Sequence, residues 1–319
     1  MAATTYDIPD TVKTIGVRSF SNNSKVKTIN IPASVTNIHE AAFAHCVGLT
    51  DINVAEGNNN YVSANGILFS KNRTTLVAYP EGKDGKSYIV PASVTTIGAS
   101  AFRENAKLEE INLPKLATTI KTNAFRDCSK LKEIELPTGI TKLEGYTFSG
   151  CGALENVKFN GDTITEIGEE AFSKCISLER MVIPSGRSKV NGQPDTETKL
   201  ARRAFSGCVE LKKLILHSTV TTIGESAFEN CSKIIIYGDK GSKAEEYATA
   251  AQRTFRVYGD INGDNIFSGT DAQQLNEYIL GVETRVFNEE QLERADVMAF
   301  GEVSGTDLLR LKWKLISKD

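Results

Sequence analysis

The segment DINGDNIFSGTD at residues 260–271 is rich in oxygen-bearing groups. The candidate donors are Asp260, Asn262, Asp264, the main-chain carbonyl of Ile266, Ser268 and Asp271. They occupy positions 1, 3, 5, 7, 9 and 12, which are the ligand positions of a calcium-binding loop. Asn265 stands at position 6, where a positive φ is needed, and Asn adopts one more readily than most residues. The segment therefore predicts one Ca²⁺ site, and the alternative is a solvated acidic turn.

A similar pattern returns at residues 296–307, DVMAFGEVSGTD. Its remaining donors are Asp296, the carbonyl of Glu302, Ser304 and Asp307. Met298 and Phe300 stand where Asn or Asp ligands would be expected, and neither side chain offers a carboxylate or amide oxygen. We therefore expect weak or no calcium binding at this second loop, with Phe300 filling the vacated volume by packing.

Both loops lead into apolar helical stretches, DAQQLNEYILG and LLRLKWKLI. Duplicated loop-helix segments of this size resemble a dockerin, the module that plugs into a cohesin on a cellulosome scaffold. The resemblance covers residues 259–319, called the tail below, and implies cohesin contacts at loop positions 10 and 11 and on the following helix. The implied contact residues are Gly269, Thr270, Asn276, Gly305, Thr306 and Lys312. The two Gly-Thr pairs permit two docking orientations, but the less similar helices favour one.

A repeat organises the chain before the tail. In IKTNAFRDCSKLKEIELP, residues 120–137, an apolar residue stands five before a Phe, a Cys three after it, a Leu six after it and an Ile nine after it. The Phe residues in this frame are Phe20, Phe43, Phe102, Phe125, Phe148, Phe172, Phe205 and Phe228. Five of the seven spacings are 23 or 24 residues. Such a period predicts a solenoid, because one unit cannot bury its own apolar face.

Each coil is expected to contain two short β-strands. One has the pattern V-T-x-I and the other L-x-x-I-x-L/V, both rich in β-forming residues. Because side chains alternate across a strand, Ile134 should point inward while Glu133 and Glu135 face solvent. The outward positions form a column that is acidic in the middle coils and basic later, ending in Arg180, Lys212 and Lys213.

All six cysteines stand three residues after a repeat Phe. A small, weakly hydrogen-bonding group suits a buried position that faces the loop backbone of the next coil. We therefore interpret the cysteines as structural. A disulfide between neighbouring coils is the less favoured alternative, and a metal site would need ligands that converge.

Three further segments depart from the repeat. Residues 55–90 contain two apolar runs around SKNRTT and predict an inserted β-hairpin. Residues 185–198 are polar and contain Gly and Pro, which indicates an exposed loop. Residues 234–256 should form a cap in which Ser242 starts a helix and Glu245 completes a capping box.

The consensus V-T-x-I-G-x-x-A-F-x-x-C-x-x-L-x-x-I-x-L-P, over residues 1–258, resembles the BspA-like leucine-rich repeat family of bacterial surface proteins. The implied fold is a mainly-β solenoid of leucine-rich repeats with a small all-α calcium-binding domain at residues 259–319. The resemblance implies a secreted or surface-attached module for adhesion and recognition, and it brings no catalytic residues.

Composition narrows the partner classes. A net charge of −3 and a pI of about 5.8 make nucleic acid and anionic membranes poor partners. The sequence contains no run of about 18 apolar residues, so no membrane span is predicted. The N-terminus does not resemble a signal peptide, although a sequence from which a signal peptide had been removed would look the same. His39, His45 and His217 are scattered, and no known catalytic motif is present.

These patterns together predict a secreted, extracellular, monomeric and non-catalytic cellulosome component. Its tail would bind a scaffold cohesin in a calcium-dependent way, and its repeats would recognise a cell-surface protein or a plant-wall ligand. Two alternatives remain open. One is a polysaccharide-binding or adhesion protein, and the other is a cryptic enzyme or protease inhibitor that uses the loop at residues 185–198.

Overall fold

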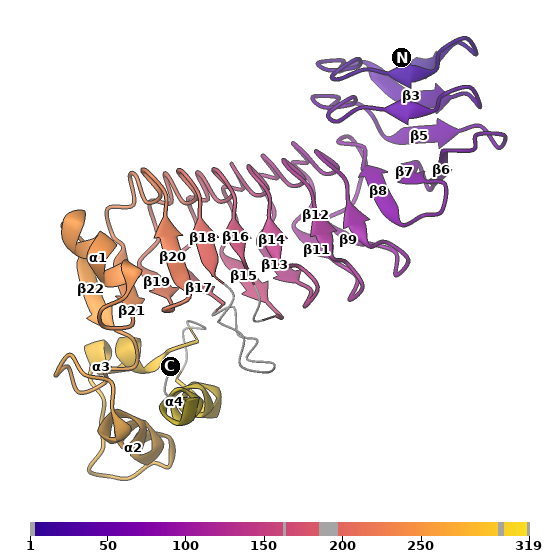
Figure 1. Ribbon diagram of the computed structural model, residues 1–319. Helices are drawn as coiled ribbons and strands as arrows, with labels where there is room; N and C mark the ends of the chain where they lie inside the picture. Colours follow the sequence, from indigo (N-terminus) through magenta and orange to yellow (C-terminus); the bar gives the residue numbers. More distant parts are fainter. Residues whose placement is uncertain (1–3, 162–163, 185–196, 299–302, 318–319) are drawn as a thin grey trace.

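Short parallel strands stack along most of the chain, and helices gather at its C-terminal end (Figure 1). This computed structural model describes residues 4–161, 164–184, 197–298 and 303–317. The predicted mainly-β solenoid with a small helical tail is confirmed. The tail lies beside the last coils, next to β21 (Ile235–Gly238) and β22 (Thr254–Val257) (Figure 1).

Each regular coil contributes one strand to each of two faces. On the first face the described strands are β1 (Thr4–Asp7), β3 (Val26–Ile31), β5 (Asp51–Val54), β9 (Ser87–Ile89), β11 (Glu110–Asn112), β13 (Glu133–Leu136), β15 (Asn156–Phe159), β17 (Arg180–Ile183), β19 (Lys213–Leu216), β21 and β22. On the second face they are β2 (Thr14–Ile15), β4 (Asn37–Ile38), β8 (Thr75–Ala78), β10 (Thr96–Ile97), β12 (Thr119–Ile120), β14 (Lys142–Leu143), β16 (Glu166–Ile167), β18 (Thr198–Leu200) and β20 (Val220–Ile223).

Neighbouring coils are in register with the sequence repeat. Ile134 pairs with Val157, the residue 23 positions later. Ile134 and Leu136 are buried while Glu133 and Glu135 are exposed, as strand alternation predicts. The sequence period thus sets which side chains meet inside the solenoid.

The repeat phenylalanines stack on one another along the core. Ring centroids of Phe125 lie 5.2 Å from those of both Phe102 and Phe148. Tyr79 stacks on Phe102 at 5.2 Å and so extends this column into the coil that the repeat template does not find. Phe20 and Phe43 stack separately, 5.7 Å apart, in the core of the first coils.

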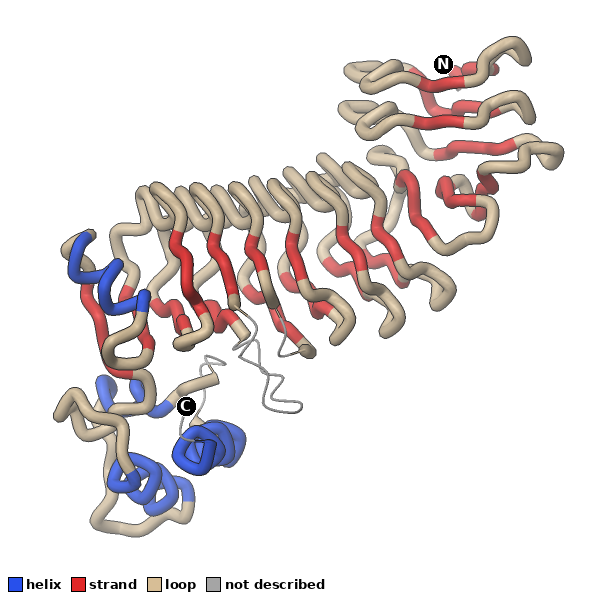
Figure 2. The backbone as a smooth tube through the Cα atoms, viewed as in Figure 1, coloured by secondary structure: helices blue, strands red, loops and turns tan. Residues whose placement is uncertain are grey.

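Within the predicted insertion at residues 55–90, residues 61–78 form a meander of three antiparallel strands. Strand β7 (Ile67–Ser70) pairs with β6 (Tyr61–Ala64) on one side and with β8 on the other. The two apolar runs predicted around SKNRTT are β7 and β8, and the third strand, β6, was not predicted. The direction of the stack changes at this insertion (Figure 2), and the buried residues divide there into an N-terminal core and a long main core.

The cysteines are all buried, as the structural interpretation predicts, and none of them is in a disulfide. Each thiol donates to the carbonyl of a repeat Phe, as Cys128 Sγ does to Phe102 O at 3.1 Å. The other pairs are Cys46–Phe20, Cys151–Phe125, Cys175–Phe148, Cys208–Phe172 and Cys231–Phe205. The acceptor belongs to the preceding coil, whereas we expected the next one. Burial raises the pKa of the Cys46 thiol to about 11, which keeps it neutral.

The end of the stack is covered by α1 (Lys243–Ala250) and β22. Ala244 and Ala248 are buried, and the helix begins after Ser242 as predicted. The capping box was wrong, because the Ser242 side chain makes no capping hydrogen bond. Glu245 instead accepts from the main-chain N–H of Gly241 at 2.6 Å.

Most of the predicted loop at residues 185–198 lies outside the described residues. Its last residue, Thr198, was assigned wrongly, because it is a buried residue of β18. The Thr198 hydroxyl donates to the carbonyl of Ile164 at 2.6 Å, which ties this strand to the preceding coil.

Candidate metal centre and partner surface

The tail contains three helices, α2 (Gly269–Ile279), α3 (Glu289–Ala295) and α4 (Gly305–Ser317). As predicted, α2 and α4 follow the two loops, and they pack against each other. Helix α3 was not predicted from the sequence. Its signal is a complete capping box in which Asn288 accepts from the Gln291 amide and the Gln291 side chain accepts from the Asn288 amide.

The first loop is organised around the carboxylate of Asp260. Asp260 Oδ1 accepts from the amides of Gly263 and Asp264, at 2.7 and 3.1 Å. Asp260 Oδ2 accepts from the amide of Asn265 at 3.0 Å. Asn265 adopts φ 62°, so the positive φ expected at position 6 is present. These bonds wrap the main chain tightly around the residue at position 1.

The aspartate at position 12 closes each loop in the same way. Asp271 accepts from the main-chain amides of Asn262 at 3.2 Å and Ser268 at 2.9 Å, and also from that of Ile261. In the second loop Asp307 accepts from the amide of Met298 at 2.9 Å and from that of Ser304 at 2.9 Å. Asp271 and Asp307 are fully buried. The sequence duplication is therefore a structural duplication as well.

The donors of the first loop fit calcium by their chemistry. All are oxygens of carboxylate, amide, hydroxyl or carbonyl groups, the hard ligands that Ca²⁺ prefers. Among the described residues no three His, Cys, Asp or Glu side chains gather as a metal cluster. The assignment therefore rests on the type and order of the donors. Arg294 Nη1 lies 2.9 Å from Asp260 Oδ2, so one cation already faces this buried carboxylate.

The second loop offers a poorer site. The Asp296 side chain is almost fully buried, and its Oδ2 lies 3.2 Å from Arg180 Nη1 and 3.9 Å from Lys213 Nζ. Glu302 and Phe300 lie outside the described residues. The described residues of this loop do not fit a calcium site, because two cations face the carboxylate of Asp296 and Met298 offers no oxygen donor where the first loop has Asn262.

The predicted cohesin-contact residues lie mainly on the surface of the tail. Gly269 and Thr270 are exposed at the start of α2, and Gly305 and Thr306 are exposed at the start of α4. The two threonines are held alike, with Thr270 Oγ1 2.7 Å from Ser268 Oγ and Thr306 Oγ1 2.6 Å from Ser304 Oγ. Lys312 is exposed, whereas Asn276 is half-buried.

The tail packs on the outward face of the last coils. Outward residues Ile215 and Tyr237 are buried in one apolar cluster with tail residues such as Leu275 and Val297. Lys213 was predicted to be an exposed member of the basic column, but its side chain is only 1% exposed. The prediction failed because strand alternation assigns a residue to a face and does not show what covers that face.

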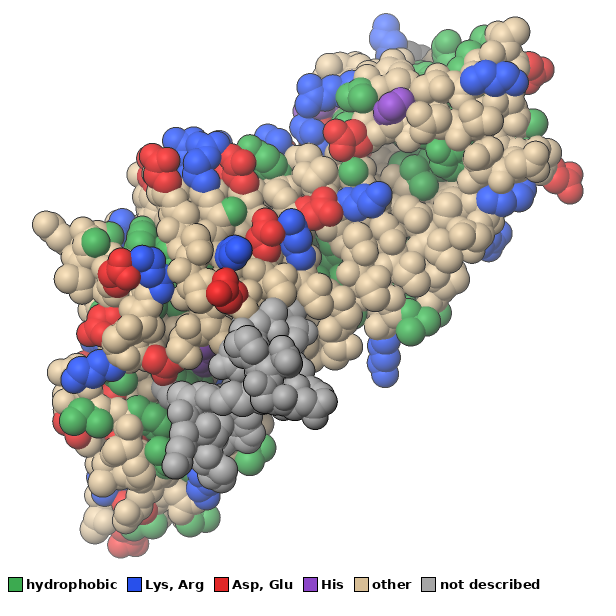
Figure 3. Space-filling view, in the orientation of Figure 1, with side chains coloured by type: hydrophobic (Ala, Val, Ile, Leu, Met, Phe, Trp, Pro, Cys, Tyr) green, Lys and Arg blue, Asp and Glu red, His purple; other side chains and the backbone are tan. Residues whose placement is uncertain are grey.

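Several other residues of the outward column form ion pairs between neighbouring coils. Lys132 Nζ lies 2.8 Å from Glu109, and Lys158 Nζ lies 2.8 Å from Glu135. The predicted change from acid to base along the stack omitted these lysines. On the face shown in Figure 3 acidic and basic side chains lie side by side over the coils.

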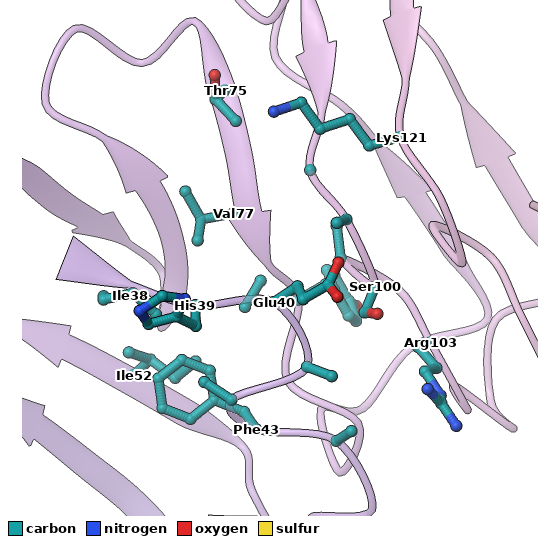
Figure 4. A pocket seen from close by; sticks show the side chains of 18 of the residues that line it. Ile38, His39, Glu40, Phe43, Ile52, Thr75, Val77, Ser100, Arg103 and Lys121 are labelled. Carbon is teal, nitrogen blue, oxygen red and sulfur yellow. The ribbon is translucent and has the colours of Figure 1, made fainter. Parts of the chain in front are cut away.

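A cavity of about 530 Å³ opens where the inserted hairpin interrupts the second face. Ile38, Phe43 and Val77 contribute apolar surface, and the charged side chains of Glu40 and Lys121 also line it (Figure 4). The cavity therefore combines apolar contact with groups of both charges.

None of the described helices is both long enough and apolar enough to cross a lipid bilayer.

Two family profiles match the chain. The BspA type Leucine rich repeat region matches residues 2–82, 78–194 and 189–248, in six copies. The Dockerin type I domain matches residues 258–316. No curated protein matches the chain.

Several solved structures resemble the repeats. A leucine-rich repeat protein from Eubacterium ventriosum is 30% identical, with a TM-score of 0.64, over 73% of this chain and 60% of that protein. A leucine rich cell surface protein from Faecalibacterium prausnitzii is 29% identical, with a TM-score of 0.53, over 75% of this chain and 54% of that protein. This chain thus spans less than two thirds of either structure. The pneumococcal vaccine antigen PcpA, 22% identical with a TM-score of 0.57 over 79% of this chain and 67% of that protein, shares the fold.

Proposed function

Because this chain belongs to the BspA-type leucine-rich repeat family and carries a type I dockerin domain at residues 258–316, we propose that it binds a cohesin of a cellulosome scaffold in a calcium-dependent way. Leucine-rich repeats and dockerins are non-catalytic interaction modules, and their combination points to an extracellular, cellulosome-type role. The finer proposal is a monomeric, non-catalytic component in which residues 1–258 form the repeat domain and residues 259–319 the dockerin.

The loop of residues 260–271 is the proposed calcium site. Its six donors, from Asp260 to Asp271, would hold one ion, which supplies positive charge among three aspartates. Support comes from the main-chain amides that fix Asp260, and from the buried Asp271 that joins the loop to α2. Because the ligands must converge, ion binding should stabilise this loop and the start of α2.

The proposed cohesin surface is the pair of helix starts. Gly269 with Thr270, and Gly305 with Thr306, are exposed and similarly oriented by their serine neighbours. Asn276 and Lys312 would add contacts from the two helices. Since one is half-buried and the other exposed, we propose one dominant docking orientation.

The repeats are the proposed recognition surface for a cell-surface protein. The similarity of the repeats to the leucine rich cell surface protein from Faecalibacterium prausnitzii supports a role at the cell surface. The cavity lined by Phe43, Glu40 and Lys121 supports a ligand with both apolar and charged groups. Binding assays with surface-protein extracts and with insoluble wall polysaccharide would separate this role from polysaccharide attachment.

A panel of cohesins tests the tail directly. Asp260→Ala with Asp264→Ala should abolish calcium-dependent retention, because two charged donors are lost, while circular dichroism of the repeats stays unchanged. Asp10→Ala with Asp84→Ala is the matched control, since it removes two carboxylates from the repeats. Equal retention of the loop variant and the wild-type chain would refute the proposed site.

A further inference from the structure

We propose that Arg180 and Lys213 of the repeats do at the second loop what calcium does at the first, so that the chain binds one Ca²⁺ ion and keeps this half of its tail folded on the solenoid without metal. The comparison with the first loop rests on the proposed calcium function. The contact itself does not, because it is built from described side chains.

The two cations come from adjacent strands. Arg180 of β17 and Lys213 of β19 are register partners on the outward face. Arg180 Nη1 lies 3.1 Å from Glu293 Oε2 and 3.2 Å from Asp296 Oδ2. Asp296 is position 1 of the second loop, the counterpart of Asp260. The repeats therefore place positive charge at the residue where a calcium loop places its first ligand.

Lys213 also holds the main chain of the tail. Its ammonium group donates to the main-chain carbonyls of Glu293 and Asp296, the latter at 2.6 Å. These residues lie at the C-terminal end of α3, where unpaired carbonyls and the helix dipole favour a cation. The ammonium group also lies 5.0 Å from the ring centre of Tyr237. A buried lysine is costly unless it is paired in this manner, so the arrangement is a built site.

Charge separates the two loops. In the first loop, Arg294 pairs with Asp260, and the two negative charges of Asp264 and Asp271 equal the charge of one Ca²⁺. Glu290 shares that arginine but is also paired with Arg256.

In the second loop, Arg180 and Lys213 both face Glu293 and Asp296, so these two negative charges are balanced by protein cations. A divalent ion would meet two protein cations there. It would also lack the donors that Met298 and Phe300 replace.

Apolar packing surrounds this polar centre. Ile215 of β19 and Tyr237 of β21 are buried with Val297, which directly follows Asp296. Because neither the apolar contact nor the cation pairs need metal, the second half of the tail should keep its position when calcium is removed. A bound cohesin would then sit at a fixed angle to the repeats.

Hydrogen exchange of the full chain, measured in excess chelator, tests the clamp. We expect α3 to stay protected in the wild-type chain while the first loop exchanges faster. Lys213→Met with Arg180→Met keeps most of the apolar bulk and should speed exchange in α3 by about a hundredfold, as expected when a buried pair is broken. Lys212→Met is the matched control, because Lys212 is exposed and pairs only with Glu179 among the described contacts. Peptides from β13 and β15 report whether the repeats remain folded.

Calcium titration by calorimetry supplies the second readout. We expect one ion per chain, lost in Asp260→Ala with Asp264→Ala and retained in Asp296→Asn. A second ion that disappears in Asp296→Asn would overturn the proposal, as would unchanged exchange in α3 after both cations are removed. Failure to bind any cohesin would refute the proposed function and leave both of these measurements untouched.

Discussion

Glu81 is an acidic side chain in an unfavourable environment near the N-terminal end of the stack. Burial, followed by the nearby charge of Glu104, raises its pKa from 4.5 to about 7. The carboxylate of Glu104 has its own partners, because it lies 3.0 Å from His45 Nε2 and 2.8 Å from Arg103 Nε. Its neighbour Glu81 is therefore the group whose ionisation should lower the stability of the first coils.

The sign of the effect follows from proton linkage. Because the folded pKa exceeds the unfolded one, the folded chain binds the proton more tightly, and the stabilisation is complete below pH 4.5 and lost as pH rises through about 7. Glu81→Gln should remove this contribution. We expect the thermal unfolding midpoint of the wild-type chain, relative to that of Glu81→Gln, to fall between about pH 5 and about pH 8. Parallel pH curves for the two proteins would contradict this assignment.

Single residues show both the reach and the limit of sequence reasoning. The left-handed conformation of Asn265 was predictable, because it depends on its own side chain and its place in a loop. The stacking role of Tyr79 was missed, because the template required a phenylalanine and the inserted hairpin shifted the spacing. Lys213 was misplaced because its burial depends on a segment about 80 residues later in the chain.

At the scale of elements, each coil is stabilised mainly by its neighbours. Phe125 is fully buried between the rings of two adjacent coils, whereas Phe20 is half-buried in the first coils. Strands of two to four residues, such as β12 and β13, could not persist alone and depend on this stacking.

Phe125→Ala should therefore destabilise the chain by about 3–5 kcal/mol, the range for removal of a buried aromatic ring. Phe20→Ala should cost less, since part of that ring already contacts water. Urea unfolding followed by circular dichroism measures both changes. A larger loss for Phe20→Ala would show that the column of rings is not the main support of the coils.

Elements were predictable where local sequence determines them. The paired strands, α1, α2 and α4 follow from periodicity and flanking residues. The capping signal of α3 was present at Asn288 and Gln291 but was overlooked. The change of direction at the inserted hairpin could not be predicted, because it depends on how β7 and β8 pack against coils on both sides.

At the scale of the whole molecule, the repeats and the tail are joined closely. Strand β22 ends at Val257, and the first loop begins three residues later at Asp260. The shared apolar cluster and the contacts of Lys213 span this junction. The chain thus carries its proposed cohesin surface at one end and leaves the coil surface beyond the tail contact available for recognition.

Calcium-dependent docking of the tail onto a cohesin is the function proposed for this chain. Isothermal titration calorimetry with the cohesin selected from the panel tests it most directly, in the presence of calcium and again in excess chelator. We expect saturable binding with calcium and none in chelator, with binding restored when calcium is returned. Binding of equal affinity in both conditions would contradict it.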